Sequence, residues 1–256
     1  MIVRKSQMEI ERMYASGQLV GRVLAALRAM VRPGVTTMDL EDRAVAMIRE
    51  AGATAAFKGY YVPAARKKFP AALCTSVNHE VVHGIPSRKR VLREGDIVKV
   101  DCGVLLDGYY GDSATTIPVG TVSRETEHLL QVTREALDLA IEQMVEGRRL
   151  ADLSHAVQGH VESAGFSIVK EFVGHGIGRK LHEDPQVPNH VDPKVPNPRL
   201  REGIVLAIEP MVAAGDARTR ILRDRFTAVT RDGSNAAHFE HCVAVTANGP
   251  RLLTAV

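Results

Sequence analysis

The chain has 256 residues, of which 45% are hydrophobic, so it can bury a core as one large or two small domains. It carries 33 Lys plus Arg against 30 Asp plus Glu, a balance that argues against nucleic-acid binding as the main activity. The three cysteines are an odd number and lie far apart, which is typical of reduced thiols in a cytoplasmic protein. Residues 1–11 are too charged for a signal peptide, and no run approaches the ~18 apolar residues of a membrane-spanning helix.

Two pairs of amphipathic helices are predicted from the spacing of apolar residues. They cover, roughly, residues 6–31, 37–51, 123–145 and 151–164. The two pairs align at a constant offset of 113 residues, which matches Gly34 to Gly147. This shared layout predicts two structurally related halves, about 6–120 and 121–250.

After each helix pair the pattern changes to that of β-strands. The predicted strands are 72–76, 95–101, 109–119, 167–173, 204–209, 226–229 and 239–245. Helices followed by strands, twice over, predict an α+β fold in which helices cover a curved, mainly antiparallel sheet, with one cleft between the halves. No linker or low-complexity segment interrupts the pattern, so we expect residues 1–256 to form a single catalytic domain.

A β-hairpin is predicted around the Asp107-Gly108 turn. With a two-residue loop, Asp101 faces Ala114, and Asp112 lies diagonally next to Asp101 on the same face. One strand aspartate is often only a turn or edge residue. Two of them on one face of an apolar hairpin indicate a shared function.

Four carboxylates and one imidazole lie near the ends of apolar strands: Asp101, Asp112, His175, Glu209 and Glu240. His175 itself is expected in a glycine-rich loop, residues 174–178, from which its ring can reach into the cleft. Burying a carboxylate costs free energy unless a hydrogen bond, an opposite charge or a metal compensates it, and the sequence offers no obvious basic partner beside Glu209 or Glu240. Four carboxylates carry a charge of about −4, which two divalent cations balance. With one imidazole they make the oxygen-rich shell that two-metal hydrolases use. The sequence therefore predicts a dinuclear metal hydrolase.

A competing motif is present at residues 79–83. His79, Glu80 and His83 spell H-E-x-x-H, the signature of single-zinc peptidases, which places both histidines on one face of a helix. Two β-branched residues lie inside the motif, and Gly84 and Pro86 follow it, so we expect no helix there. His83 is expected at a strand-to-loop edge where it contacts substrate, and His79 in an exposed loop.

Several short motifs, taken in order, resemble those of type I methionine aminopeptidases. They are Cys74-Thr75-Ser76, His83-Gly84-Ile85-Pro86, Asp101 with Gly111-Asp112, Gly174-His175-Gly176-Ile177-Gly178, Ile208-Glu209-Pro210-Met211 and Glu240-His241. The resemblance runs from the first predicted helix to Leu253. It implies the pita-bread fold, with two pseudo-symmetric halves, and metal ligation by the five residues above, with Asp112 and Glu240 bridging two ions.

The same resemblance implies roles for three residues in hydrolysis by a metal-bridged hydroxide. His83 would contact the scissile amide, His182 would stabilise the substrate carbonyl as it becomes tetrahedral, and Glu209 would act as both ligand and proton shuttle. A pocket for the methionine side chain would be formed by Tyr60, Phe69, Cys74, Phe172 and Phe226.

The chain departs from the family pattern at two places that touch no ligand. Residues 62–68 are extra, between Tyr60 and Phe69, and Phe226 stands where family members often have Trp.

The expected function is removal of the N-terminal Met from nascent chains whose second residue is small. Two alternatives stay open: a single-zinc peptidase that uses the H-E-x-x-H motif, and a non-catalytic binding protein on the same fold. The expected cofactors are two divalent ions, Co, Mn, Fe or Zn. The expected partners are N-terminal Met peptides and the ribosome, with no specific nucleic acid and no membrane, and we expect a cytoplasmic monomer.

Overall fold

The computed structural model describes residues 2–255. Its helices are α1 (Gln7–Met30), α2 (Thr37–Glu50), α3 (Arg124–Glu142) and α4 (Leu150–Ser163). All four predicted helices are confirmed, with ends that differ by at most three residues from those expected. Reciprocal capping boxes define two of the starts, because Ser6 and Glu9 cap α1, and Thr36 and Asp39 cap α2. None of the helices within residues 2–255 is long and apolar enough to cross a lipid bilayer.

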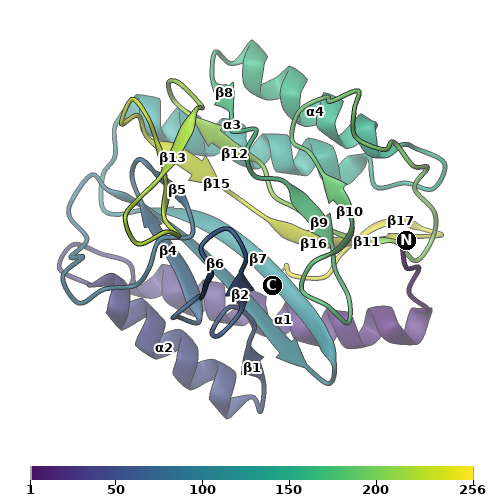
Figure 1. Ribbon diagram of the computed structural model, residues 1–256, viewed down its shortest axis with the longest axis horizontal. Coiled ribbons are helices and arrows are strands. Elements are labelled where there is room, and N and C mark those ends of the chain that lie inside the picture. Colours follow the sequence, from purple (N-terminus) through teal and green to yellow (C-terminus); the bar gives the residue numbers. More distant parts are fainter. Residues whose placement is uncertain (1, 256) are drawn as a thin grey trace.

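The offset of 113 residues between the two helix pairs also relates the turns inside the pairs and the strands that follow them. Gly34 and Gly147, in the turns between paired helices, have φ values of 92° and 91°. Each pair is followed by a short strand at the same offset, namely β1 (Thr54–Ala55) and β8 (Ser167–Ile168). In the view of Figure 1 the α1–α2 pair lies below the strands and the α3–α4 pair lies above them. The predicted pseudo-symmetry is therefore visible in the backbone.

The first half contains one four-stranded antiparallel sheet. It is formed by β1, β4 (Leu73–Val77), β6 (Ile97–Leu106) and β7 (Tyr109–Pro118). The predicted hairpin and its register are confirmed, because Asp101 pairs with Ala114 across β6 and β7. Asp107 and Gly108 take φ values of 49° and 80°, as the two-residue turn requires. Helix α1 lies directly on β7, since a Cβ added to Gly111 would stand only 2.8 Å from a backbone nitrogen of the helix.

The second half contributes a five-stranded and a three-stranded antiparallel sheet. The former has the order β10 (Glu183–Val187), β9 (Gly174–Gly176), β11 (Val205–Ile208), β16 (His241–Thr246), β17 (Gly249–Leu252). The latter has the order β15 (Ala236–His238), β12 (Met211–Ala213), β8. The expected strand 167–173 was predicted too long. It ends at Ile168 because the chain then turns outward, leaving Lys170 and Glu171 exposed.

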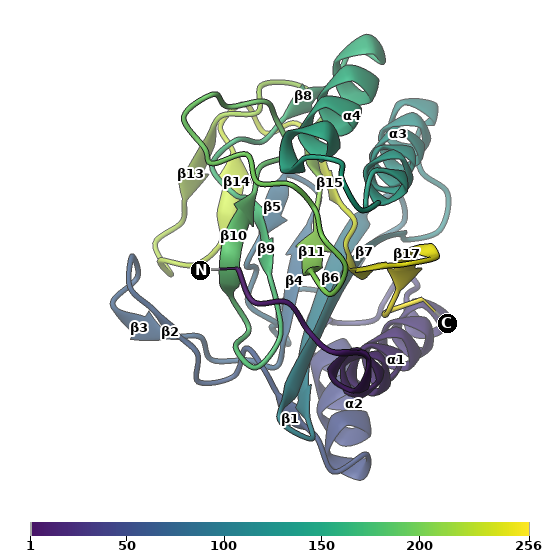
Figure 2. The ribbon, with the colours of Figure 1, turned by 90° about the vertical axis from the view of Figure 1, so that its right-hand side faces the viewer.

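Strands from both halves meet in a fourth sheet, which has three strands, and one hairpin stands apart. The sheet has the order β13 (Thr219–Ile221), β14 (Ala228–Thr230), β5 (Glu80–Val82), and the hairpin pairs β2 (Tyr61–Val62) with β3 (Lys67–Lys68). Pairing of β5 with β14 joins the two halves across the cleft. Viewed from the side, the β2–β3 hairpin and β13 project from the same side of the molecule (Figure 2).

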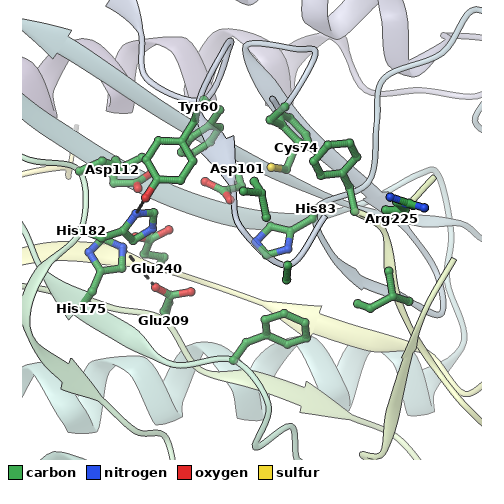
Figure 3. A pocket seen from close by; sticks show the side chains of 18 of the residues that line it. Tyr60, Cys74, His83, Asp101, Asp112, His175, His182, Glu209, Arg225 and Glu240 are labelled. Carbon is green, nitrogen blue, oxygen red and sulfur yellow. Dashed lines mark hydrogen bonds and ion pairs between the residues drawn. The ribbon is translucent and has the colours of Figure 1, made fainter. Parts of the chain in front are cut away.

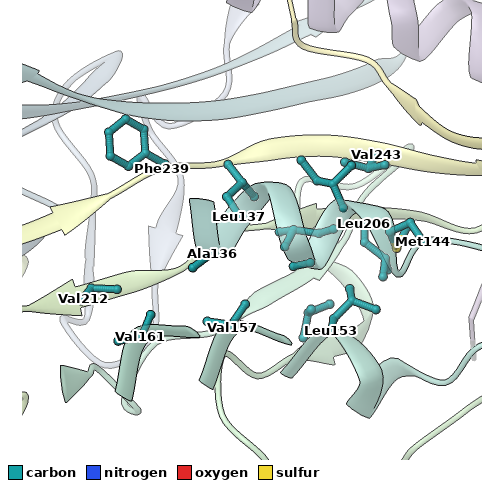
Figure 4. Packing of buried hydrophobic residues seen from close by; sticks show 14 of the residues in the cluster. Ala136, Leu137, Met144, Leu153, Val157, Val161, Leu206, Val212, Phe239 and Val243 are labelled. Carbon is teal, nitrogen blue, oxygen red and sulfur yellow. The ribbon is translucent and has the colours of Figure 1, made fainter. Parts of the chain in front are cut away.

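The largest cluster of buried side chains holds the second half together. Leu137 on α3 and Met144, just after the end of α3, pack with Leu206 on β11 and Val243 on β16, and each is at most 2% exposed (Figure 4). Burying one such side chain contributes about 1.5–3 kcal/mol. This packing fixes β11 and β16, whose neighbouring ends carry two of the predicted metal ligands.

Candidate metal centre

A cavity of about 570 Å³ opens between the two halves and is lined by residues of both. All twelve residues that the sequence assigns to the site lie in its wall: Tyr60, Phe69, Cys74, His83, Asp101, Asp112, Phe172, His175, His182, Glu209, Phe226 and Glu240. Figure 3 shows the acidic and imidazole groups gathered at one end of it.

The strand pairings explain why the five candidate ligands meet. Ile208 of β11 pairs with His241 of β16, so Glu209 and Glu240 emerge at the same end of the sheet. Ala207 pairs with His175 on the other side of β11. His175 therefore lies in a strand and not in the expected loop. Its glycine neighbours are needed because Cβ atoms there would collide with the carbonyl groups of adjacent strands.

The side-chain atoms of this group are close enough for shared ligation. One donor atom each from Asp112, His175 and Glu240 lies within 4.8 Å of the others. His175 Nε2 lies 3.6 Å from Glu209 Oε1. His175 Nδ1 contacts the Gly176 carbonyl at 2.9 Å, so Nδ1 carries the ring proton and donates it to that carbonyl. The lone pair of Nε2 therefore faces the carboxylates.

The electrostatics of the group are unfavourable without a cation. Burial raises the pKa of Asp101 to about 7. Burial, and then the charge of neighbouring carboxylates, raises the pKa values of Asp112, Glu209 and Glu240 well above their ordinary values. Within residues 2–255 none of the four carboxylates forms an ion pair with a lysine or arginine.

Three of these carboxylates also have a buried oxygen without a hydrogen-bond partner: Asp101 Oδ1, Asp112 Oδ1 and Glu240 Oε1. Unpaired buried oxygens cost free energy, and hard divalent cations are the groups that such oxygens bind. The donor set, four carboxylates and one neutral imidazole, therefore fits divalent metal ions.

Comparison with known proteins agrees with this chemistry. Residues 11–247 match the model of metallopeptidase family M24. The chain is 48% identical over 254 residues, 99% of each protein, to a methionine aminopeptidase of Clostridium acetobutylicum. It is 45% identical over the full length of both proteins to methionine aminopeptidase 1 of Bacillus subtilis. The chain belongs to metallopeptidase family M24.

Solved M24 structures confirm the predicted pita-bread fold. The methionine aminopeptidase of Thermotoga maritima superposes with a TM-score of 0.95, at 45% identity and complete coverage of both chains. The prolidase of Pyrococcus furiosus superposes at 0.78 with 21% identity, and the chain covers 66% of it. The second likeness shows a shared fold alone.

Two further histidines face the cavity of this M24 protein. His83 has a φ of 62°, which directs its ring into the cavity, 5.4 Å from the Phe172 ring. The His182 ring lies 4.4 Å from that of His175, and the Tyr60 hydroxyl contacts His182 Nδ1 at 2.8 Å. With that hydroxyl as donor, the neutral His182 ring carries its proton on Nε2.

The apolar wall of the cavity contains the predicted pocket residues. Phe69 and Phe226 meet edge to face with ring centroids 5.3 Å apart. Burial raises the pKa of Cys74 well above its ordinary value, so the thiol stays protonated and serves as an apolar wall. The extra residues 62–68 form the β2–β3 hairpin, and the Phe69 amide donates to the Tyr60 carbonyl at 2.8 Å at its base. The insertion thus leaves Tyr60 and Phe69 at the wall.

The H-E-x-x-H motif does not form a helix, as predicted. Glu80 begins strand β5, accepts the Val77 amide and pairs with Arg90 at 3.0 Å. His79 lies in a turn, half-buried where an exposed position was expected. Of the three motif residues only His83 lines the cavity.

Sequence reasoning missed two residues at the site. His238 is 2% exposed, and its Nε2 faces Glu209 Oε2 at 3.7 Å without a hydrogen-bond partner. Its position two residues before Glu240 was an available signal, since alternate residues of an extended segment share a face. Arg225 also lines the cavity, with a left-handed φ of 73°. Nothing in the sequence indicates that conformation.

Replacing Asp101 should stabilise the metal-free protein. The folded-state pKa of Asp101, about 7, exceeds its ordinary value of 3.8, so the folded chain binds more protons in that range and loses stability as pH rises through it. We expect Asp101→Asn, measured by denaturant unfolding in chelator at about pH 8, to be more stable by at least ~1 kcal/mol. The difference should vanish near pH 4. Asp107→Asn, in an exposed turn, is the matched control. A less stable Asp101→Asn protein at about pH 8 would contradict this account of the buried charge.

Proposed function

We propose that this protein is a methionine aminopeptidase that hydrolyses the first peptide bond of chains starting with Met, when the second residue is small. One observation carries the proposal. The twelve residues that the type I resemblance assigns to ligation, catalysis and methionine binding surround a single cavity. The names of the relatives, at 41–48% identity, point to the same activity.

The five candidate ligands would hold two divalent ions. By the type I resemblance, Asp112 and Glu240 would be shared between the ions, and Asp101, His175 and Glu209 would complete the donor set. Such a donor set accepts Co, Mn, Fe or Zn according to availability. When bound, the ions lower the pKa of a coordinated water and polarise the substrate carbonyl.

Side chains of the protein would carry out the other steps of hydrolysis. Glu209 would hold the proton taken from the attacking water and pass it to the leaving amine. His182, with its proton on Nε2, would donate to the developing oxyanion. His83 would hold the scissile amide. His238 faces Glu209 and would orient its carboxylate.

The wider assignments follow from the same function. The chain would act as one catalytic domain and as a monomer, on nascent chains in the cytoplasm, with the ribosome as a partner. It would need no specific nucleic acid and no membrane. These assignments are supported by the balanced charge and the absence of disulfides among its three buried, free cysteines.

Peptide hydrolysis tests the function directly. Metal-loaded protein should release Met from a Met-Ala-Ser peptide and leave Met-Lys-Ser nearly intact. An N-acetylated Met-Ala-Ser peptide is the control, because it lacks the free amine that an aminopeptidase requires. Cleavage of the acetylated peptide, or of internal bonds, would contradict the proposal.

The single-zinc alternative makes a different prediction at Glu80. We expect Glu80→Gln to keep nearly full peptidase activity, because Glu80 is not part of the cavity wall and its carboxylate pairs with Arg90. His79→Ala should behave likewise. Steady-state kinetics on Met-Ala-Ser is the measurement. A loss of ~100-fold in turnover, the scale expected for a missing general base, would favour the single-zinc reading.

A further inference from the structure

Two segments far apart in the sequence, residues 57–69 and 217–226, supply nine residues of the cavity wall: Phe57, Tyr60, Val62, Ala64, Phe69, Ile221, Leu222, Arg225 and Phe226. Tyr60 and Ile221 are also exposed to solvent, so the two segments border the mouth of the cavity. They touch each other through the Phe69 and Phe226 rings, and Arg225 Nη1 donates to the Ala65 carbonyl at 3.4 Å. The β2–β3 hairpin belongs to the first segment and β13 to the second, and both project from one side of the molecule (Figure 2). We call these two segments the collar.

The collar concentrates positive charge. Its eight basic residues are Lys58, Arg66, Lys67, Lys68, Arg218, Arg220, Arg223 and Arg225. Asp224 is its single acidic residue, so the collar has a net charge of +7, against +3 for the whole chain and −4 for the remainder. Within residues 2–255, Arg218 is the one member of the eight that forms an ion pair, with Asp216. The carboxylate of Asp224 accepts the amides of Phe226 and Thr227.

Arg225 brings this charge to the cavity itself. It lines the wall beside Leu222 and Phe226, and Figure 3 shows its guanidinium at the edge of the pocket. Its left-handed backbone is unfavourable for a side chain of this size, and the turn is held by the hydrogen bonds of Asp224. A cation is thus built into an otherwise apolar stretch of wall.

We propose that the collar favours peptide substrates with Asp or Glu at the third to fifth positions. The inference rests on the proposed function. With the Met side chain in the inner cavity, the rest of the peptide leaves through the mouth. An extended chain advances ~3.3 Å per residue, so the third to fifth residues pass within one screening length, ~10 Å, of the collar. Each exposed charge pair changes affinity by up to about fivefold, and several act together on one peptide.

Three amidated peptides of equal length test the inference. They begin Met-Ala and continue with Asp-Asp, Gln-Gln or Lys-Lys. At low ionic strength we expect kcat/KM to fall in that order, by roughly tenfold from acidic to basic, with the effect mainly in KM. At high salt the three values should converge, because exposed charges are screened.

Variants locate the effect. Arg225→Asn keeps a residue that tolerates the left-handed backbone, and Lys67→Gln/Lys68→Gln alters two exposed side chains of the hairpin. Each should reduce the ratio of the acidic to the basic rate by at least about twofold, and Arg225→Lys should restore most of it. Arg22→Gln, on an exposed site of α1 outside the cavity wall, is the control and should leave the ratio unchanged.

The outcomes separate the two proposals. If no Met-Ala peptide loses its Met, the proposed function fails. If all three lose it at equal, salt-independent rates, only the selectivity is overturned. If the variants leave peptide rates unchanged but weaken binding of a fluorescent RNA oligonucleotide, measured by anisotropy, the collar is a nucleic-acid surface and the inference is also overturned.

Discussion

Asp112→Ala and Glu240→Ala are each expected to abolish peptidase activity and to remove at least one bound metal ion. Both carboxylates are buried, and both belong to the three-residue cluster whose donor atoms lie within 4.8 Å. In the proposed two-ion centre both carboxylates would be shared, so the loss of either would leave an incomplete shell for both ions. Turnover should fall by at least ~1000-fold, the scale expected when a required nucleophile is no longer generated.

A variant in the same hairpin serves as the control for these two substitutions. Asp107→Asn, in the exposed turn of the same hairpin, tolerates the left-handed backbone there and should keep its metal and its activity. Metal content is measured by atomic absorption after gel filtration, and folding by circular dichroism. Either variant retaining more than a few per cent of turnover with full metal content would show that the residue does not bridge.

His182→Ala should lower turnover by about two to three orders of magnitude, with modest changes in KM and metal content. A donor aimed at a developing oxyanion acts in the transition state and little in the ground state. The geometry supports this, because the ring stands next to His175 and receives the Tyr60 hydroxyl at Nδ1, which leaves Nε2–H toward the cavity. Partial burial lowers the pKa of His182, which keeps the ring neutral.

A second variant separates this role from ligation. Tyr60→Phe removes the hydroxyl that orients the ring, and it should reduce turnover less than His182→Ala while leaving metal content intact. His155→Ala, on the exposed face of α4, is the control. If His182→Ala raises only KM, or strips a metal, the residue binds substrate or metal and the assigned role is wrong.

Much of the site was predictable because its determinants are local. The Asp107-Gly108 turn fixes the register of one hairpin, and with it the neighbouring positions of Asp101 and Asp112. Carboxylates at the ends of apolar strands could be read as ligands because their burial has no other compensation in the sequence.

The rest depends on pairings between distant segments. His238 approaches Glu209 only because β12 and β15 pair across a long loop. The contact of Arg225 with the β2–β3 hairpin joins residues 160 positions apart. His175 was expected in a loop because glycines usually mark loops. Here they allow close approach of the neighbouring strands.

The central claim is that five ligands form a two-ion centre on which peptidase activity depends. Calorimetric titration of the metal-free protein with Mn²⁺ or Co²⁺, with Met release from Met-Ala-Ser measured at each addition, tests it most directly. We predict two ions bound per chain, and activity that appears only as they bind. Full activity in excess chelator, or a single bound ion whose affinity is unchanged in Asp112→Ala, would contradict it.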